Sequence, residues 1–516
     1  MSTNRFNSIV IVGGGTAGWV SACILAKHLE SKNPKSVQVT VIESPDIPTV
    51  GVGEGTWPTM RRTLESIGVD ETAFIKQCQA TFKQGTRFIG WNNSQERQTY
   101  YNLFSSIYDP GEFNLAPYWS LGLAGEARSY AESVSAQGIA CDQFLAPKKI
   151  TSKSYEALQS YAYHLDAGLF ADFLKNHATT HLGVTHLPAN VQDVLLDEQG
   201  SIEAVSTDEY GEVSGDLFID CTGFRSLLLG DALGVGFKEL NDTLFNDRAI
   251  AMQVPYPDAD SEIECVTLST AQPAGWIWDI GLQNRRGVGH VYSSRYMDDD
   301  TAEGLLRDYV GDGSKELSTR NIKMKVGCRK QFWRKNCVAI GLSAAFMEPL
   351  EASAIFLVEA AANMVADLFP RNNDAMHHAQ EKFNKSFEFR WDRTVDFIKL
   401  HYVLSPRSDS EFWRDNKHSA SIPASLQKSL KAWANHPVSK YDFSDINEPF
   451  PHESYQYILH GMGFAQNLGN IDSYPNVMQA KKCFENVQKA TQFLCDELPT
   501  HRDLINRVHQ YGFQNL

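Results

Sequence analysis

The sequence predicts an α/β protein with a doubly wound parallel sheet, and two stretches of the chain support this prediction. Residues 7–12 (NSIVIV) end in a β-branched apolar run typical of a strand, a glycine turn follows, and WVSACILAKHL then has helical spacing. A second strand, VQVTVIE, ends at Glu43. Residues 336–356 repeat the order of apolar strand, small-residue turn and helix, which is typical of a sheet flanked by helices.

The glycine turn contains Gly13, Gly15 and Gly18 in a G-x-G-x-x-G arrangement, with Thr16 and Ala17 between the last two glycines. In such a turn the first glycine permits the tight bend, the second lets a pyrophosphate approach the backbone, and the third lets the helix pack on the strand. The helix N-terminus offers N–H groups to the phosphate. The acid that ends the second strand can bind ribose hydroxyls. Together with the strand, the turn and the helix, it predicts a dinucleotide site.

Two further features favour FAD over NAD as the dinucleotide. A second glycine loop, VGVGEGT (50–56), follows the second strand and places Gly55 where a flavin could lie along it. The segment 336–356 could hold the ribityl chain and place a helix N-terminus near the isoalloxazine, with Leu342 and Ile355 as cofactor contacts. The sequence contains no second dinucleotide fingerprint, so we expect the flavin to be reduced by a separate protein.

Size, charge and cysteine usage limit the other functions of the chain. Its 516 residues, 42% of them hydrophobic, can form a large core and more than one structural unit. A net charge of -15 disfavours nucleic acid and anionic membranes as partners. We find no apolar run long enough to span a bilayer, and residues 1–6 are too short and polar for a signal peptide. Nine scattered cysteines without a C-x-x-C pair predict reduced, mostly buried thiols, no metal site and a cytoplasmic location.

An ordered set of motifs resembles the flavin-dependent halogenase family, typified by the tryptophan halogenases. The resemblance runs from the N-terminus to at least residue 413. It implies an FAD-binding domain with an inserted antiparallel sheet over 1–360 and a mainly helical substrate-covering region over 361–516. It also implies that Val191 lies on the adenine side of the cofactor. The stretches that carry it are GGGTAGW (13–19), VGVGEGT (50–56), TFKQGTRFIGW (81–91), YAYHLDAGLFADFL (161–174), FIDCTGFRSLL (218–228), GWIWDIG (275–281), MEPLEAS (347–353) and RWDRTVDFIKLHYVLSPRSDSEFW (390–413).

The resemblance also implies an activity. In the family, reduced FAD and O2 oxidise chloride or bromide to hypohalous acid, and a lysine transfers the halogen to an electron-rich aromatic such as tryptophan, an indole or a phenol. Lys83 matches that lysine. An amine suits the role because it can donate a hydrogen bond to hypohalous acid or form a chloramine, whereas the alternative is a surface lysine such as Lys76. The implied partners are a flavin reductase and a small aromatic substrate, and a homodimer is left open.

MEPLEAS contains the remaining catalytic candidates. Glu351 matches the family's glutamate and could accept the ring proton, with Glu348 as its rival. Either acid could instead cap the helix that follows. The halide is expected at the backbone N–H groups of Ser353 and Ala354, with Ala352 beside the substrate. Family members have Ser-Thr-Gly at these three positions, so the missing glycine at position 354 leaves the turn geometry open.

Two other motifs allow both a structural and a functional interpretation. GWIWDIG matches the family signature W-x-W-x-I-P except that Gly281 replaces proline, and its Trp276 and Trp278 either lie near the tunnel or form a core pair. His164 and Asp166 lie at a strand-to-helix junction. We favour helix capping by Asp166 over a catalytic dyad.

The substrate side is less specific. Tyr455 lies where tryptophan-type relatives hold the amino-acid end of their substrate, but the sequence contains no convincing clamp for it. Two alternatives therefore remain for the whole protein. One is an FAD-dependent aromatic monooxygenase, in which Lys83 would have no role. The other is a flavin-binding homologue without activity, suggested by the departures at Gly281, Ala352 and Ala354.

Overall fold

The computed structural model describes residues 6–47, 53–92, 99–108, 113–125 and 128–514. The chain forms two compact units, and each is assembled from three separate segments. Unit 1 comprises Met1–Gln79, Leu165–Asn241 and Met324–Trp391, and unit 2 comprises Ala80–His164, Asp242–Lys323 and Asp392–Leu516. The expected division into an FAD-binding domain over 1–360 and a helical region over 361–516 stays a prediction.

Unit 1 is built on a six-stranded sheet whose strands run in the order β20-β21-β12-β1-β2-β8. Strand β1 lies between β2 and β12 and is parallel to both, so the strand order reverses at β1 as in a doubly wound sheet. The expected strands at both ends of the glycine turn are therefore confirmed. The strands are β1 (Ser8–Val12), β2 (Gln38–Glu43), β8 (Thr185–Pro188), β12 (Leu217–Asp220), β20 (Trp333–Arg334) and β21 (Cys337–Ala339).

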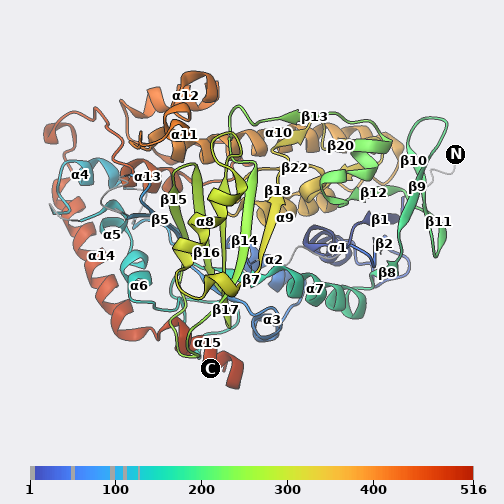
Figure 1. Cartoon of the computed structure of the whole chain (residues 1–516), viewed down its shortest axis with the longest axis horizontal. Helices are drawn as coiled ribbons and strands as arrows, with labels where there is room; N and C mark the ends of the chain where they lie inside the picture. Colours follow the sequence, from blue (N-terminus) through green and yellow to red (C-terminus); the bar gives the residue numbers. More distant parts are fainter. Residues whose placement is uncertain (1–5, 48–52, 93–98, 109–112, 126–127, 515–516) are drawn as a thin grey trace. The chain divides into compact units, whose positions relative to one another are not determined.

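Three helices form a layer of unit 1, with α1 packed against both α7 and α9 (Figure 1). Buried small and apolar side chains on α1 explain this packing, because they fill the space between neighbours on two sides. The helices of this unit are α1 (Thr16–His28), α2 (Thr59–Ser66), α3 (Glu71–Gln77), α7 (Ala167–His181) and α9 (Ser353–Asp367). Its smaller strands are β3 (Gly53–Gly55), β9 (Val191–Leu196), β10 (Ile202–Thr207), β11 (Gly211–Ser214), β13 (Phe237–Glu239), β19 (Gly327–Arg329) and β22 (Ala345–Phe346).

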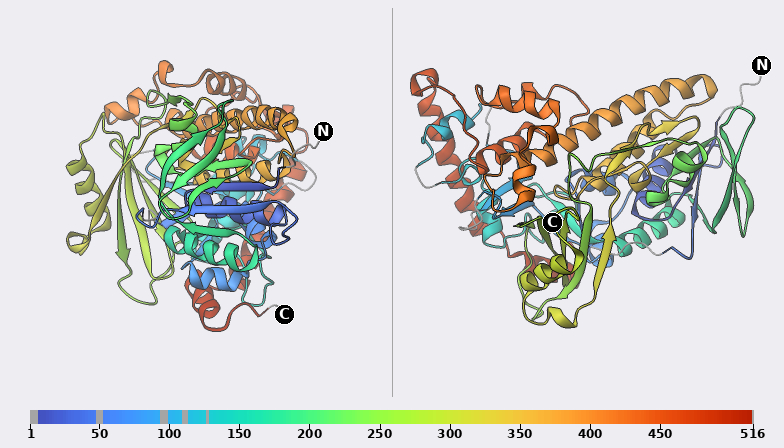
Figure 2. Two further views of the ribbon diagram at one scale, coloured as in Figure 1. Left: turned by 90° about the vertical axis from the view of Figure 1, so that its right-hand side faces the viewer. Right: turned by 45° about the horizontal axis from the view of Figure 1, so that its top comes forward.

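Unit 2 contains the inserted sheet that the family resemblance implied. Seven strands lie in the order β18-β14-β17-β16-β15-β5-β6, and all neighbours are antiparallel except β15 and β5. Helix α8 (Asp299–Val310) covers one face of β14 and β17 and buries an apolar cluster there (Figure 2). The strands are β5 (Gly85–Ile89), β6 (Thr99–Leu103), β14 (Arg248–Pro255), β15 (Thr267–Gln272), β16 (Gly275–Gly281), β17 (Arg285–Tyr292) and β18 (Thr319–Lys323).

The C-terminal part of unit 2 is mainly helical, as the sequence predicts. A core cluster joins α5, α14 and β6 through side chains such as Tyr101, Val134 and Phe484. The helices of the C-terminal segment are α11 (Glu411–Asp415), α12 (Ala424–Trp433), α13 (His452–Gly461), α14 (Val477–Glu497) and α15 (His501–Tyr511), and the first segment of the unit contributes α4 (Ala116–Ser120), α5 (Tyr130–Val134) and α6 (Gln137–Asp142). A short strand, β4 (Thr81–Lys83), pairs with β7 (Ala162–Asp166). The division between the two units falls within β7 and within α10 (Asn373–Leu404).

The α/β fold with a parallel sheet, an antiparallel sheet and a helical C-terminal region is thus confirmed. All nine cysteines are free thiols and seven of them are buried, which also agrees with the prediction. Across the described residues, every helix is too short or too polar to cross a bilayer.

Candidate active site

The glycine turn after β1 has the geometry expected for binding a dinucleotide. Gly13 has a φ of 114°, and a Cβ atom there would lie 2.2 Å from the carbonyl oxygen of Cys221. A Cβ on Gly18 would lie 1.9 Å from the carbonyl oxygen of Gly13, so α1 packs directly on the turn. Gly13 therefore requires glycine for its conformation and for the close approach of the backbone, and Gly18 requires it for the close approach alone.

Gly15 has the opposite environment, which fits a phosphate. It is the N-cap residue of α1, and because it has no side chain, the first N–H groups of the helix have no side-chain acceptor from it. Apart from its chain neighbours, no atom lies within 4 Å of the position that a Cβ on Gly15 would take. The N–H groups of Thr16 and Ala17 follow in this first turn. Open space beside helix N–H donors is the arrangement that accepts a pyrophosphate.

Glu43 ends β2 in the same corner of the sheet. A Cβ on Gly14 would lie 2.5 Å from its Oε1 atom, which places the carboxylate directly beside the glycine turn. Its Oε2 atom is 2.8 Å from Nε2 of His186 and 3.5 Å from Nζ of Lys175. A carboxylate held at the end of the second strand fits the ribose hydroxyls of FAD.

The segment after β21 also approaches the start of α1. A Cβ on Gly341 would lie 2.7 Å from Cβ of Ala17, so this turn packs against the glycine loop. Leu342 follows Gly341 and is 38% exposed, which leaves its side chain available for a cofactor. The donors and the carboxylate of unit 1 therefore fit FAD. The predicted contacts Gly55, Val191 and Ile355 lie in β3, at the start of β9 and in the first turn of α9, while Val50, Gly51 and Val52 lie outside the described residues.

Glu351 lies in a tight turn that precedes α9. The N–H of Ala352 donates to the carbonyl of Pro349 at 3.0 Å, and Ala352 adopts a left-handed conformation with φ 51° and ψ 38°. The indole Nε1 of Trp57 donates to the carbonyl oxygen of Glu351 at 2.7 Å. The Trp57 ring also stacks on Phe356 at 4.3 Å, so one side chain ties the turn to the helix.

The capping alternative for Glu351 and Glu348 is wrong. Helix α9 begins at Ser353 with Ala352 as N-cap, no side chain caps it, and its first turn contains no acid. Both glutamates precede the helix and are buried. Ala354 is helical, and the left-handed residue is Ala352, so the turn does not depend on glycine at position 354.

Ser353 and Ala354 begin α9 and contribute N–H groups of its first turn. The N-cap residue has only a methyl side chain, which cannot accept a hydrogen bond from these groups. Backbone donors at the positive end of a 15-residue helix fit a small anion such as a halide.

Glu359 is a buried acid of α9 that the sequence analysis missed. Its carboxylate is 2% exposed and accepts hydrogen bonds from the hydroxyls of Thr59 at 2.9 Å and Thr63 at 2.5 Å, which joins α2 to α9. Burial raises the pKa of the Glu359 carboxyl to about 7. An acid within the apolar run FLVEAAANMVADLF is the signal that could have revealed it.

Lys83 is the last residue of β4 in unit 2 and is 1% exposed. Its backbone pairs with Ala162 of β7, and its Nζ lies 5.3 Å from the centre of the Phe104 ring. The alternative of a surface lysine is therefore wrong, in contrast to Lys76, which is exposed. Burial of an amine is costly and is typical of a functional group.

The neighbours of Lys83 are tied to distant segments. The Thr81 hydroxyl donates to the carbonyl of Gly281 at 2.5 Å, and the Gln84 N–H donates to the carbonyl of Cys265 at 2.7 Å. Gly281 is paired with Arg286 as a regular residue of β16. Its replacement of proline thus leaves the strand intact, and its backbone carbonyl accepts from Thr81.

The other ambiguous residues of unit 2 have structural contacts. Trp276 and Trp278 are both buried, with ring centres 6.5 Å apart, which agrees with the core-pair interpretation. Tyr455 is buried among aromatic rings, stacked on Phe443 at 4.3 Å, so its substrate role stays a prediction. The ring of His164 bonds the Thr267 hydroxyl at 2.9 Å, and burial, followed by the charge of Lys83, holds the pKa of His164 well below its usual range.

Capping by Asp166 is confirmed within unit 1. Its carboxylate is at the N-cap of α7 and accepts the N–H of Leu169 at 2.9 Å.

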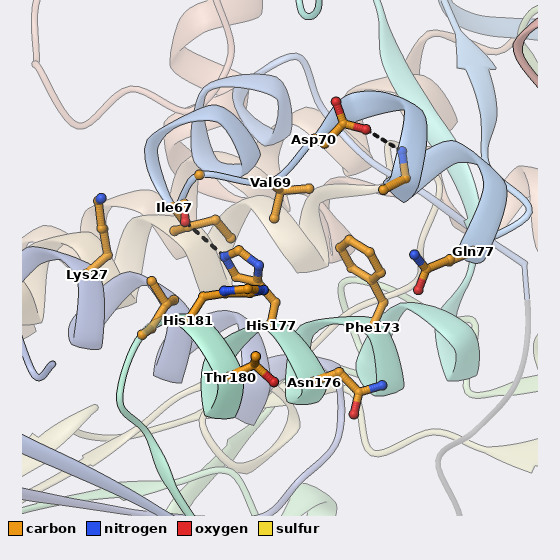
Figure 3. A pocket seen from close by; sticks show the side chains of 13 residues that line it. Lys27, Ile67, Val69, Asp70, Gln77, Phe173, Asn176, His177, Thr180 and His181 are labelled. Atoms are coloured by element: carbon orange, nitrogen blue, oxygen red, sulfur yellow. Dashed lines mark hydrogen bonds between the residues drawn. The ribbon is translucent and has the colours of Figure 1, made fainter. Parts of the chain in front are cut away.

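A hollow of about 530 Å³ in unit 1 contains none of the predicted site residues. Helix α7 contributes Phe173, His177 and His181 to its wall, and Lys27 and Ile67 lie opposite (Figure 3). The His177 ring donates from Nε2 to the carbonyl of Ile67 at 2.9 Å. Within the described residues no group of three or more His, Cys, Asp or Glu could hold a metal ion.

Comparisons with known proteins agree with this geometry. The family model described as tryptophan halogenase matches residues 8–471. Tryptophan 6-halogenase SttH of Streptomyces toxytricini is 34% identical over 99% of this chain and all of its own length. Tryptophan 7-halogenase RebH of Lentzea aerocolonigenes is 31% identical over 98% of this chain and 99% of its own.

A solved structure extends the similarity to the whole fold. The crystal structure of tryptophan halogenase from Shewanella frigidimarina NCIMB 400 superposes with a TM-score of 0.95, 44% identity and coverage of 99% of both chains. Family model, sequence relatives and fold therefore agree over almost the full length. The chain belongs to the tryptophan halogenase family of flavin-dependent halogenases and is an enzyme of the oxidoreductase class.

Proposed function

We propose that this protein halogenates an electron-rich aromatic, with tryptophan as the first candidate and other indoles or phenols as the alternatives. The observation that carries the proposal is the full-length similarity to enzymes named as tryptophan halogenases. The cofactor would be FAD in its reduced form, supplied by a separate flavin reductase. The halide would be chloride or bromide, and the oxidant O2.

In unit 1 the chain would bind the cofactor and the halide. The N–H groups of Thr16 and Ala17 would hold the pyrophosphate, and Glu43 would hold the ribose. Bound FADH2 with O2 would supply the oxidising power that converts halide to hypohalous acid. The N–H groups of Ser353 and Ala354 would bind the halide, because the start of α9 offers donors that its N-cap cannot satisfy.

Lys83 would hold the hypohalous acid or its halogen for transfer to the aromatic ring. A buried amine fits this role because it can donate a hydrogen bond to the oxidant where water does not compete. Glu351 would accept the proton that the ring loses. Ala352 would lie beside the substrate, and Tyr455 would contact its far end.

The test supplies FADH2 through a generic flavin reductase and offers chloride or bromide with a panel of tryptophan, indoles and phenols. Mass spectrometry should detect halogenated product with the wild-type protein. Lys83→Ala should lose more than 99% of this product, because no other group replaces the amine. FAD binding, measured by flavin fluorescence, should be unchanged.

Lys148→Met is the matched control, because Lys148 is a second fully buried lysine of unit 2 whose Nζ bonds the Lys153 carbonyl at 3.0 Å. It should retain halogenation. Hydroxylated products from the wild type would instead indicate a monooxygenase, and no product from any substrate would indicate an inactive homologue. Halogenation by Lys83→Ala would contradict the role of Lys83.

A further inference from the structure

His501 is a buried histidine that joins the C-terminal helix α15 to the strand of Lys83. Its side chain is 0% exposed. Its Nε2 atom accepts the backbone N–H of Phe82 at 2.9 Å, and its Nδ1 atom bonds the carbonyl oxygen of Ile263 at 3.2 Å. The ring also lies 5.7 Å from the Phe82 ring. A residue 419 positions away in sequence thus contacts the neighbour of the proposed catalytic amine.

These two bonds define the protonation state of His501. A backbone N–H can only donate and a carbonyl can only accept, so the ring must be neutral, with its proton on Nδ1. Burial lowers the pKa of His501 to about 3, which keeps the ring in this form near neutral pH. A protonated ring would leave the Phe82 N–H without its acceptor and would place a second positive charge near Lys83.

The environment of β4 explains why this acceptor matters. Strand β4 lies at the edge of its small sheet, where β7 pairs with one side. An amide on the other side of an edge strand must find an acceptor outside the sheet. His501 supplies it for Phe82, as Gly281 does for the Thr81 hydroxyl and Cys265 for the Gln84 N–H.

His501 itself is held firmly in place. It is the first residue of α15, whose N-cap Thr500 bonds the N–H of Asp503. The His501 N–H donates to the carbonyl of Phe144 at 2.7 Å, and Thr500 forms a bridge with Leu145. The imidazole is therefore a rigid acceptor, fixed through its own backbone.

We propose that His501 is a positioning residue for Lys83: its neutral imidazole fixes the strand that carries the amine and so sets where the amine meets the halogen oxidant. This inference rests on the proposed function of Lys83. It assigns to the C-terminal helix an indirect part in halogen transfer, through the backbone of β4.

The test compares three variants of the full-length protein. His501→Leu removes both ring bonds, and His501→Gln retains an amide oxygen that can accept from Phe82. His290→Leu is the matched control, because His290 is equally buried in unit 2 and also bonds one carbonyl, that of Ala302 at 3.0 Å, but it belongs to β17.

His501→Leu should lower kcat by about tenfold to a hundredfold, because a small displacement of a catalytic group is costly. KM for halide and for the aromatic should stay within about twofold, since neither binding site is altered. His501→Gln should recover most of kcat, and His290→Leu should retain it. A loss of kcat equal in His290→Leu would indicate general destabilisation and overturn the inference.

Hydrogen exchange gives a readout that does not depend on turnover. The peptide containing residues 80–85 should exchange faster in His501→Leu than in the wild type or in His290→Leu, because the Phe82 amide loses its acceptor. Unchanged exchange in this peptide would overturn the inference, as would unchanged kcat.

The proposed function and this inference fail in different ways. If the wild-type protein halogenates no substrate, the proposed function is wrong and the positioning role is wrong with it. If the wild type and His501→Leu halogenate equally well, only the positioning role of His501 is wrong.

Discussion

The two proposed catalytic residues are fixed in their own units by different means. In unit 2, Lys83 ends a regular strand whose neighbouring residues bond Gly281, Cys265 and His501, and positive φ angles occur beside the strand, at Gln79 (50°) and Gly85 (153°). In unit 1, Glu351 lies in a turn whose next residue, Ala352, has a φ of 51°. The strand shares its restraint among several partners, whereas the turn contains a left-handed alanine and accepts a hydrogen bond from the Trp57 indole.

The two regions also differ in the pKa values of their buried titratable groups. The buried histidines near Lys83 are neutral, because burial lowers the pKa of His501 to about 3 and that of His164 well below its usual range. The helix behind Glu351 instead contains Glu359, a buried acid whose pKa burial raises to about 7. The Glu351 region therefore contains a group that titrates near neutral pH.

The first and largest prediction uses this titration. The pKa of Glu359 rises from 4.5 to about 7 on folding, so the folded state retains its proton between these values while the unfolded state has lost it. The Glu359 contribution to the free energy of unfolding is therefore full below pH 4.5 and falls as the pH rises to 7, by on the order of 3 kcal/mol. His501 acts with the opposite sign, because its lowered pKa costs stability as the pH falls below 6.5.

Glu359→Gln isolates this effect, since glutamine does not titrate and can still accept from Thr59 or Thr63. Denaturant unfolding at pH 5 and pH 8 should show a smaller loss of stability in the variant than in the wild type. Equal losses in the two proteins would show that Glu359 is ionised throughout and that the regions do not differ in this respect.

The second prediction removes the bond that holds the Glu351 turn. Trp57→Phe keeps a ring that can stack on Phe356 but deletes the N–H that donates to Glu351, a loss of about 1 kcal/mol. The turn precedes the N–H groups proposed to bind halide, so KM for chloride or bromide should rise about fivefold while FAD binding is unchanged.

Trp333→Phe is the control for this change. Trp333 is also buried in unit 1 and donates from Nε1 to the carbonyl of Lys335 at 3.0 Å, within the hairpin of β20 and β21. It should lose similar stability with no change in halide KM. A rise in halide KM in both variants would show that the Glu351 turn is not specially dependent on Trp57.

Local sequence patterns predicted the fold better than the supports of the site. The first strand, the glycine turn and α1 follow from periodicity and glycine chemistry within about 30 residues, and the structure confirms them. The apolar strand expected at the start of the segment 336–356 coincides with β21 (Cys337–Ala339). Such elements are set by neighbouring residues, so the sequence is sufficient to locate them.

Residues whose role depends on distant contacts could not be found in the same way. His501, Trp57 and Glu359 each act on a segment about 300 to 420 residues away, and no local pattern encodes such pairs. The capping error at Glu351 has a related cause. Periodicity indicated a helix near the turn but not that it begins at Ser353, two residues after the acid.

The last and smallest prediction compares two alanines of the Glu351 region that are two residues apart. Ala352 has left-handed angles that glycine adopts without a steric penalty, so Ala352→Gly should raise the melting temperature by about 1 °C. Ala354 is in the first turn of α9, where glycine only adds freedom to the unfolded chain, so Ala354→Gly should lower the melting temperature by a similar amount. Calorimetry of both variants checks the two signs. A rise for Ala354→Gly, or a fall for Ala352→Gly, would mean that the strain lies elsewhere in the turn and that Trp57 does not hold a strained conformation.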